Sequence, residues 1–121
     1  MPNYEEWLRQ AEYDIQTAEA MLQTKRYIYT VFMCHLAIEK TFKARYTKRL
    51  NKIPPKTHEF IYFVKNLNLD LPEDISEFIS TLSEAHIVTR YTDELTKILK
   101  YFPETRCSSF LTGLTELTGY F

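Results

Sequence analysis

Apolar residues recur every three or four positions along most of the chain, the spacing that places side chains on one face of an α-helix. Residues 4–23 show this pattern most clearly, with the apolar stripe Tyr4, Leu8, Ala11, Ile15, Ala18 and Leu22. Charged residues lie largely elsewhere around the same helix, so we predict that the stripe is buried and the rest faces solvent. Asn3 is the predicted N-cap, because its side chain can accept hydrogen bonds from the first free backbone N–H groups.

A second helix is predicted over about residues 25–50, where apolar side chains are spread around most of the cylinder. A helix of this kind belongs at the centre of a bundle or at an interface with a partner. Pro54 and Pro55 end the region, since proline cannot continue a helix. Thr57 is a candidate N-cap for a third, shorter helix.

Three further segments complete the predicted fold. Pro72 opens a helix that extends to about Arg90, and Pro103 opens the last one, because proline is favoured in the first turn of a helix. Between these two helices, residues 95–101 can form a turn of helix. We therefore predict an all-α fold, an antiparallel up-and-down bundle of four or five helices, in a single domain over residues 1–121.

The composition excludes several classes of protein. Lys and Arg number 15 against 16 for Asp and Glu, so the chain has no charge excess for coating nucleic acid. Both glycines, Gly113 and Gly119, lie in the last nine residues, which leaves no glycine-rich loop to hold a phosphate. The most apolar stretch, residues 27–38, is shorter than the ~20 residues of a membrane span, so we expect no membrane association.

The cysteines and the polar N-terminal residues indicate the cellular compartment, and the histidines and cysteines indicate whether a metal is expected. Two cysteines without Cys-x-x-Cys spacing cannot form a disulfide framework, and no signal-peptide pattern opens the chain, so we expect a reduced, cytoplasmic protein with inert, buried thiols. No pair of the possible ligands has the spacing of a zinc or di-iron site: His35, His58, His86, Cys34 and Cys107. We expect neither a metal nor a cofactor.

A polar stripe runs along the otherwise apolar second helix. His35, Glu39 and Lys43 are four residues apart and therefore share one face. Because buried charges require partners, Glu39 and Lys43 are expected to pair with each other or with a group on the first helix such as Asp14. The alternative is that these side chains line a polar pocket.

The strongest local charge feature lies between residues 40 and 56, which include seven basic residues and no acid. These are Lys40, Lys43, Arg45, Lys48, Arg49, Lys52 and Lys56. Cations stabilise the C-terminal end of a helix, which is one interpretation. Binding of phosphate, RNA or an acidic partner is the other.

Four segments, taken in order, resemble the HEPN domain family over nearly the whole chain. The first helix contributes Trp7, Ala11, Asp14 and Ala18. Residues 35–44, His-Leu-Ala-Ile-Glu-Lys-Thr-Phe-Lys-Ala, are similar to the family pattern His-Gln-Ala-x-Glu-Lys-x-x-Lys-Ala. Residues 55–60, Pro-Lys-Thr-His-Glu-Phe, and 90–93, Arg-Tyr-Thr-Asp, resemble Pro-x-Thr-His-x-Leu and Arg-Tyr-Pro-Asp. Leu36 replaces the usual glutamine and Thr92 the usual proline.

The resemblance implies a helical bundle that is often homodimeric and is often encoded beside a minimal nucleotidyltransferase in a toxin-antitoxin pair. It also implies a nucleotide-binding cleft or dimer seam around six residues: Asp14, Glu39, Lys43, His58, Arg90 and Tyr91. Ribonuclease members of the family carry Arg, four to six residues and then His. That motif is missing here, since no histidine follows Arg90 or Arg106 at this spacing.

The pattern without its nuclease motif favours a nucleotide-binding accessory subunit of a minimal nucleotidyltransferase, which is not an enzyme by itself. In this interpretation Lys43 and Arg90 face phosphate, and Tyr91 faces base or ribose. One alternative is a metal-independent endoribonuclease toxin in which His58 or His86 approaches Arg90. A second is a non-catalytic dimeric scaffold, because 18 aromatic residues could form a protein interface. The expected partners are a second copy of the chain, the nucleotidyltransferase, and nucleotide or RNA.

Overall fold

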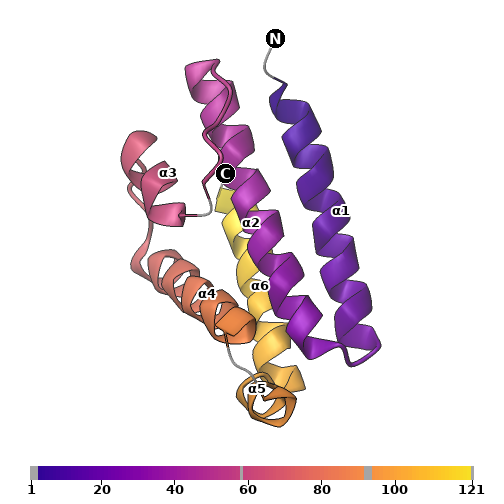
Figure 1. Cartoon of the computed structure of the whole chain (residues 1–121). Coiled ribbons are helices and arrows are strands. Elements are labelled where there is room, and N and C mark those ends of the chain that lie inside the picture. The colour runs from indigo at the N-terminus through magenta and orange to yellow at the C-terminus, as the bar shows by residue number, and fades with distance from the viewer. Residues whose placement is uncertain (1–2, 58, 92–93, 121) are drawn as a thin grey trace.

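The computed structural model describes residues 3–57, 59–91 and 94–120 (Figure 1), and for residues 86, 89–91, 116 and 118–120 it describes the backbone alone. These ranges form six α-helices and no strand. Four helices are long: α1 (Tyr4–Gln23), α2 (Tyr27–Leu50), α4 (Glu73–Tyr91) and α6 (Glu104–Tyr120). Two have seven residues each: α3 (Phe60–Asn66) and α5 (Leu95–Tyr101).

The all-α prediction is confirmed. The described ranges hold six helices against the predicted four or five, because the turn of helix expected over residues 95–101 forms the separate helix α5. Ile98 explains its stability, because this side chain is buried and anchors the short helix to the core. In the described ranges no helix has both the length and the apolar character needed to cross a bilayer.

The ends of the first two helices follow from single side chains. Asn3 Oδ1 accepts hydrogen bonds from the backbone N–H groups of Glu5 (3.0 Å) and Glu6 (3.3 Å), which confirms the predicted N-cap. At the same, open end of the hairpin (Figure 1), Asn51 closes α2 in the left-handed conformation with φ 51°. Asparagine tolerates this conformation, and its N–H donates to the carbonyl of Thr47 at 2.9 Å.

The predicted start of the third helix is wrong by two residues, because the N-cap is Glu59 and not Thr57. Helix α3 begins at Phe60, and Thr57 lies before it rather than at its N-cap. The Thr57 hydroxyl accepts a hydrogen bond from the backbone N–H of Glu59 at 3.2 Å. The threonine therefore closes a local turn ahead of the helix, a use of the hydroxyl that competes with capping.

Helix α2 occupies the centre of the bundle, as its apolar surface predicts. Helices α1 and α2 form an antiparallel hairpin, α4 and α6 pack against α2, and α6 also contacts α1 (Figure 1). Phe42 of α2 stacks at 5.9 Å from Phe63 and lies 5.6 Å from Phe60, both on α3. Each fully buried aromatic side chain of this kind contributes about 1.5–3 kcal/mol to folding.

Helices α4 and α6 approach each other closely at Gly113. A Cβ atom at this position would lie 2.5 Å from the ring of Phe78. Glycine weakens the interior of an isolated helix, so its presence in α6 reflects this contact. The ring of Phe78 also lies 6.4 Å from that of Phe110, which holds it against α6.

The buried face of α1 is narrower than the predicted stripe and centres on its two alanines. Ala11 and Ala18 are buried together with the charged Asp14, whereas Leu8 is 46% exposed. Small alanines allow the α1 backbone to lie close against α2, which leaves the larger side chains at the edge of the contact. Ile15 is only half-buried for this reason.

Candidate functional site

Two ion pairs lie along the contact between α1 and α2. On α2, Lys43 Nζ lies 2.9 Å from Glu39 Oε1, and the two side chains are only 12% and 5% exposed. The prediction that Glu39 and Lys43 pair with each other is confirmed. The ammonium of Lys43 also lies 5.3 Å from the ring centroid of Trp7 on α1, within the range of a cation–π contact.

Asp14, the alternative partner that the sequence offered for this pair, is bound to another residue of α2. Its carboxylate lies 2.7 Å from the ammonium of Lys40, so it pairs across to α2 with the residue beside the Glu39–Lys43 pair. Asp14 is 6% exposed, and a buried carboxylate requires such a cation. The Asp14–Lys40 pair and the contact of Lys43 with Trp7 therefore join α1 to α2, and Glu39 holds Lys43 in place from within α2.

The six predicted site residues divide into two groups. Asp14, Glu39 and Lys43 lie at the α1–α2 contact. His58 and the side chains of Arg90 and Tyr91 lie outside the described residues. Convergence of all six around one cleft therefore stays a prediction. The same holds for the ribonuclease alternative, because the His86 side chain is also outside the described residues.

His35, the first residue of the polar stripe, packs inside the bundle. Its ring is 3% exposed and lies 4.6 Å from the ring of Phe60, with 31° between the planes. The histidine thus belongs to the contact between α2 and α3. Across the described residues, no three His, Cys, Asp or Glu side chains gather in a group that could hold a metal ion.

Both cysteines are buried thiols with depressed reactivity. Burial raises the pKa of Cys34 to about 12, with a contribution from the nearby Cys107, and it raises the pKa of Cys107 to about 11. The thiol of Cys107 donates to the carbonyl of Tyr27 at 3.6 Å. Because the thiolate is the nucleophile, neither group is prepared for covalent catalysis at neutral pH.

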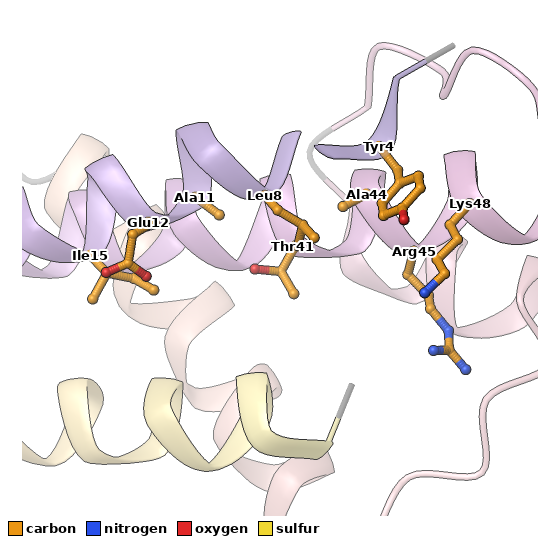
Figure 2. Close-up of a pocket in the computed structure, with 9 residues that line it drawn as sticks. All are labelled: Tyr4, Leu8, Ala11, Glu12, Ile15, Thr41, Ala44, Arg45 and Lys48. Carbon is orange, nitrogen blue, oxygen red and sulfur yellow. The ribbon is translucent and has the colours of Figure 1, made fainter. Parts of the chain in front are cut away.

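A pocket of about 330 Å³ lies between α1 and α2 (Figure 2), within the size range of small-molecule sites. Helix α1 lines it with Tyr4, Leu8, Ala11, Glu12 and Ile15. Helix α2 lines it with Thr41, Ala44, Arg45 and Lys48. None of the six predicted site residues is among these nine. The lining is mostly apolar, with a small number of polar groups.

The polar groups of the pocket are divided between its two ends. Figure 2 shows Tyr4, Arg45 and Lys48 grouped at one end, and Glu12 beside Ile15 at the other. Lys48 Nζ lies 5.1 Å from the ring centroid of Tyr4, so cation and aromatic ring form one unit. The pocket therefore has a cationic end and an anionic end.

Two hydrogen bonds show which groups in the middle of the pocket and at its anionic end can still donate to or accept from a ligand. The Thr41 hydroxyl donates to the carbonyl of Ala37 at 2.8 Å, so its oxygen can only accept from a ligand. Glu12 Oε1 accepts from Gln16 Nε2 at 3.4 Å. A carboxylate is also solely an acceptor. Near Thr41 and Glu12 the pocket therefore favours ligand groups that donate hydrogen bonds. At the end with Arg45 and Lys48 it favours ligand groups that accept them.

Two features of the sequence come together in this pocket, although neither predicted it alone. Tyr4 and Leu8 belong to the predicted buried stripe of the first helix, and Arg45 and Lys48 belong to the basic cluster of the second. The sequence feature that could have indicated the pocket is a stripe of large apolar residues on one predicted helix together with a basic segment on the next. Which cations would meet that stripe depends on the register of α1 against α2.

These observations define an all-helical bundle with a small pocket in its first hairpin. The profile of the HEPN domain family matches residues 4–110, and the chain belongs to this family. Among solved structures it is similar to TT1696 from Thermus thermophilus, with a TM-score of 0.85 and 22% identity, over 99% of this chain and 96% of that one. At this identity the likeness concerns the fold. Comparison with curated proteins gives no match.

Proposed function

We propose that this HEPN domain is a nucleotide-binding accessory subunit and that nucleotide binds in the pocket between α1 and α2. The observation that carries the proposal is the composition of this pocket, a mainly apolar cavity of about 330 Å³ with Arg45, Lys48 and Tyr4 at one end. A nucleotide has the matching construction, because a flat apolar base is joined through ribose to a charged phosphate.

The cationic end is the phosphate site of the proposal. Arg45 and Lys48 are three residues apart on α2 and therefore point to the same side of the helix. Arginine can bind two phosphate oxygens at once, and lysine adds a compact charge. Tyr4 lies against Lys48 and offers an aromatic face to the ribose or base.

In this proposal, the buried ionic residues position the pocket and do not contact the ligand. Asp14 pairs with Lys40 across the two helices, and Lys43, held by Glu39, lies against Trp7 of α1. These contacts hold the two helices together, and the pocket lies along the same hairpin. The role resembles that of supporting residues in other binding sites, whose side chains fix the groups that touch the ligand.

The accessory role is supported by what the pocket lacks among its lining residues. None of the nine is a serine, cysteine or histidine that could serve as a nucleophile or as its neutral-pH base. The ribonuclease spacing Arg-x(4–6)-His is also absent from the sequence. We therefore propose that the chemistry is performed by a partner, a minimal nucleotidyltransferase, and that the domain supplies or senses the nucleotide as a homodimer.

Calorimetric titration with nucleoside mono-, di- and triphosphates tests the binding. We expect measurable affinity for the intact protein and a loss of about tenfold in Lys48→Gln and in Arg45→Gln, the size expected for one charge-assisted hydrogen bond in a partly solvated site. Lys56→Gln is the matched control, because Lys56 is an exposed member of the same basic cluster outside the pocket.

Two results would contradict the proposal. One is a flat response of the intact protein to every nucleotide in the panel. The other is an equal loss of affinity in Lys56→Gln, which would assign binding to the general charge of the segment rather than to the pocket.

A further inference from the structure

We infer that Glu12 makes the pocket selective for nucleotides whose base carries an exocyclic amino group, such as those of adenine and cytosine. The inference rests on the proposed function, since it concerns the orientation of the nucleotide in the same pocket. It assigns a specificity-determining role to a residue that the sequence did not single out.

The two ends of the pocket set the direction of the ligand. Arg45 and Lys48 lie at one end, so the phosphate binds there (Figure 2). Eight residues separate Tyr4 from Glu12 on α1, which corresponds to a rise of about 12 Å along the helix. A single nucleotide can extend along this length, which places its base towards Glu12.

The base then lies in a section of the pocket that is apolar apart from two acceptors. Leu8, Ala11 and Ile15 supply apolar surface for the faces of the base. The hydroxyl hydrogen of Thr41 is already donated to the carbonyl of Ala37 at 2.8 Å. Glu12 and Thr41 therefore both present oxygen atoms that accept hydrogen bonds.

This arrangement distinguishes between bases that differ at one edge. The exocyclic amino group of adenine or cytosine donates hydrogen bonds. Hypoxanthine and uracil have a carbonyl oxygen at the same place, which cannot donate to the carboxylate, so these bases must shift to offer their neighbouring ring N–H instead. A site that cannot satisfy a ligand's polar group discriminates against that ligand more strongly than one that merely loses a contact.

The nucleotide pairs AMP and IMP, and CMP and UMP, test the inference, because each pair differs at this amino group. In calorimetric titrations we expect AMP to bind about tenfold more tightly than IMP, with the same order for CMP over UMP. Glu12→Gln keeps the size of the side chain but adds a donor, so the AMP-to-IMP ratio should fall towards one.

Glu19→Gln is the matched control for this variant. Glu19 is an exposed residue of the same helix, it does not line the pocket, and its substitution removes the same charge. We expect the control to keep the preference for AMP. Circular dichroism at the titration temperature establishes that both variants are folded.

The outcomes separate this inference from the function on which it rests. If neither AMP nor IMP binds the intact protein, the proposed function fails and the inference fails with it. If both bind equally and both are weakened by Lys48→Gln, nucleotide binding stands and the role of Glu12 is overturned. An unchanged preference for AMP in Glu12→Gln overturns it as well.

Discussion

The carboxylate of Glu39 lies 2.9 Å from the ammonium of Lys43 one turn further along α2, with both side chains almost removed from solvent. Removal of one partner takes this close opposite charge away from the other, which stays buried. We expect Lys43→Met to lower the free energy of unfolding by about 3 kcal/mol, measured by urea denaturation. The double variant Glu39→Met/Lys43→Met should regain most of this loss, because both charges are then gone.

A surface pair provides the comparison. Arg9 and Glu6 lie 3.1 Å apart on α1, but their side chains are 75% and 48% exposed. Arg9→Met should change the free energy of unfolding by less than about 1 kcal/mol, because solvent screens such a pair. Strictly additive losses in the Glu39/Lys43 double variant would contradict the assignment of this pair as a coupled unit.

Gly113 is expected to be intolerant of even a single added methyl group. In Gly113→Ala the new Cβ would lie 2.5 Å from the ring of Phe78, so the ring or helix α6 must move. Such overpacking costs about 1–3 kcal/mol, which exceeds the gain of up to about 1 kcal/mol from the better helix propensity of alanine. We expect a net fall in thermal and urea stability, and partial recovery when Phe78→Leu is added. A Gly113→Ala variant more stable than the parent would contradict this prediction, because it would mean that the ring of Phe78 can move aside at little cost.

The sequence predicted most helix ends because these depend on local chemistry. Asn3 caps α1 through its own side chain, and Pro72 and Pro103 directly precede α4 and α6. Thr57 was assigned to the wrong position because a threonine hydroxyl serves a cap and a local turn equally well. The sequence offers no means of choosing between these two uses.

The pocket could not be predicted because it depends on how α1 rotates and slides against α2. Periodicity marked Leu8 as part of the buried stripe, but the contact centres on Ala11 and Ala18, and Leu8 is left at the edge. The partner of Asp14 was missed for the same reason, since Lys40 is the cation that this register brings within 2.7 Å. Long-range register is a property of tertiary packing, which a one-dimensional pattern does not contain.

The buried thiols should make the protein less stable at high pH. Burial raises the pKa of Cys34 from 9.0 to about 12, so the folded chain keeps a proton that the unfolded chain loses. The contribution of this thiol is therefore complete below about pH 9 and declines as the pH rises towards 12. Between pH 9 and 11 we expect a loss of about 1.4 kcal/mol per pH unit for such a group.

Urea titrations of the parent and of Cys34→Ala across this pH interval isolate the effect. The fall in the free energy of unfolding with pH should be shallower in the variant by the amount that Cys34 contributes. Equal slopes in the two proteins would contradict a raised pKa for this thiol. Thiol-specific labelling at pH 8 gives a second measurement, since Cys34 should react only after denaturation.

The proposed homodimer gives a direct expectation for the mass in solution. Several large apolar side chains are exposed in the single chain, including Tyr29, Ile53, Ile61, Leu95 and Tyr101. Exposed apolar and aromatic residues are typical of surfaces that pack against another protein. Light scattering coupled to gel filtration should give twice the mass of one chain. A stable monomer at low micromolar concentration would contradict the homodimer.

Filling the pocket should abolish nucleotide binding without unfolding the protein. Leu8 lines the pocket and is 46% exposed, so the larger side chain of Leu8→Trp can occupy the cavity without displacing the core. We expect unchanged or slightly increased thermal stability, because the new ring buries apolar surface, and a loss of affinity for AMP of at least about tenfold. Tyr13→Trp is the matched control, since Tyr13 is on the same helix, is 72% exposed and does not line the pocket. If Leu8→Trp is folded and binds AMP as tightly as the control does, nucleotide occupies some other part of the domain, and the assignment of Arg45 and Lys48 to its phosphate is wrong.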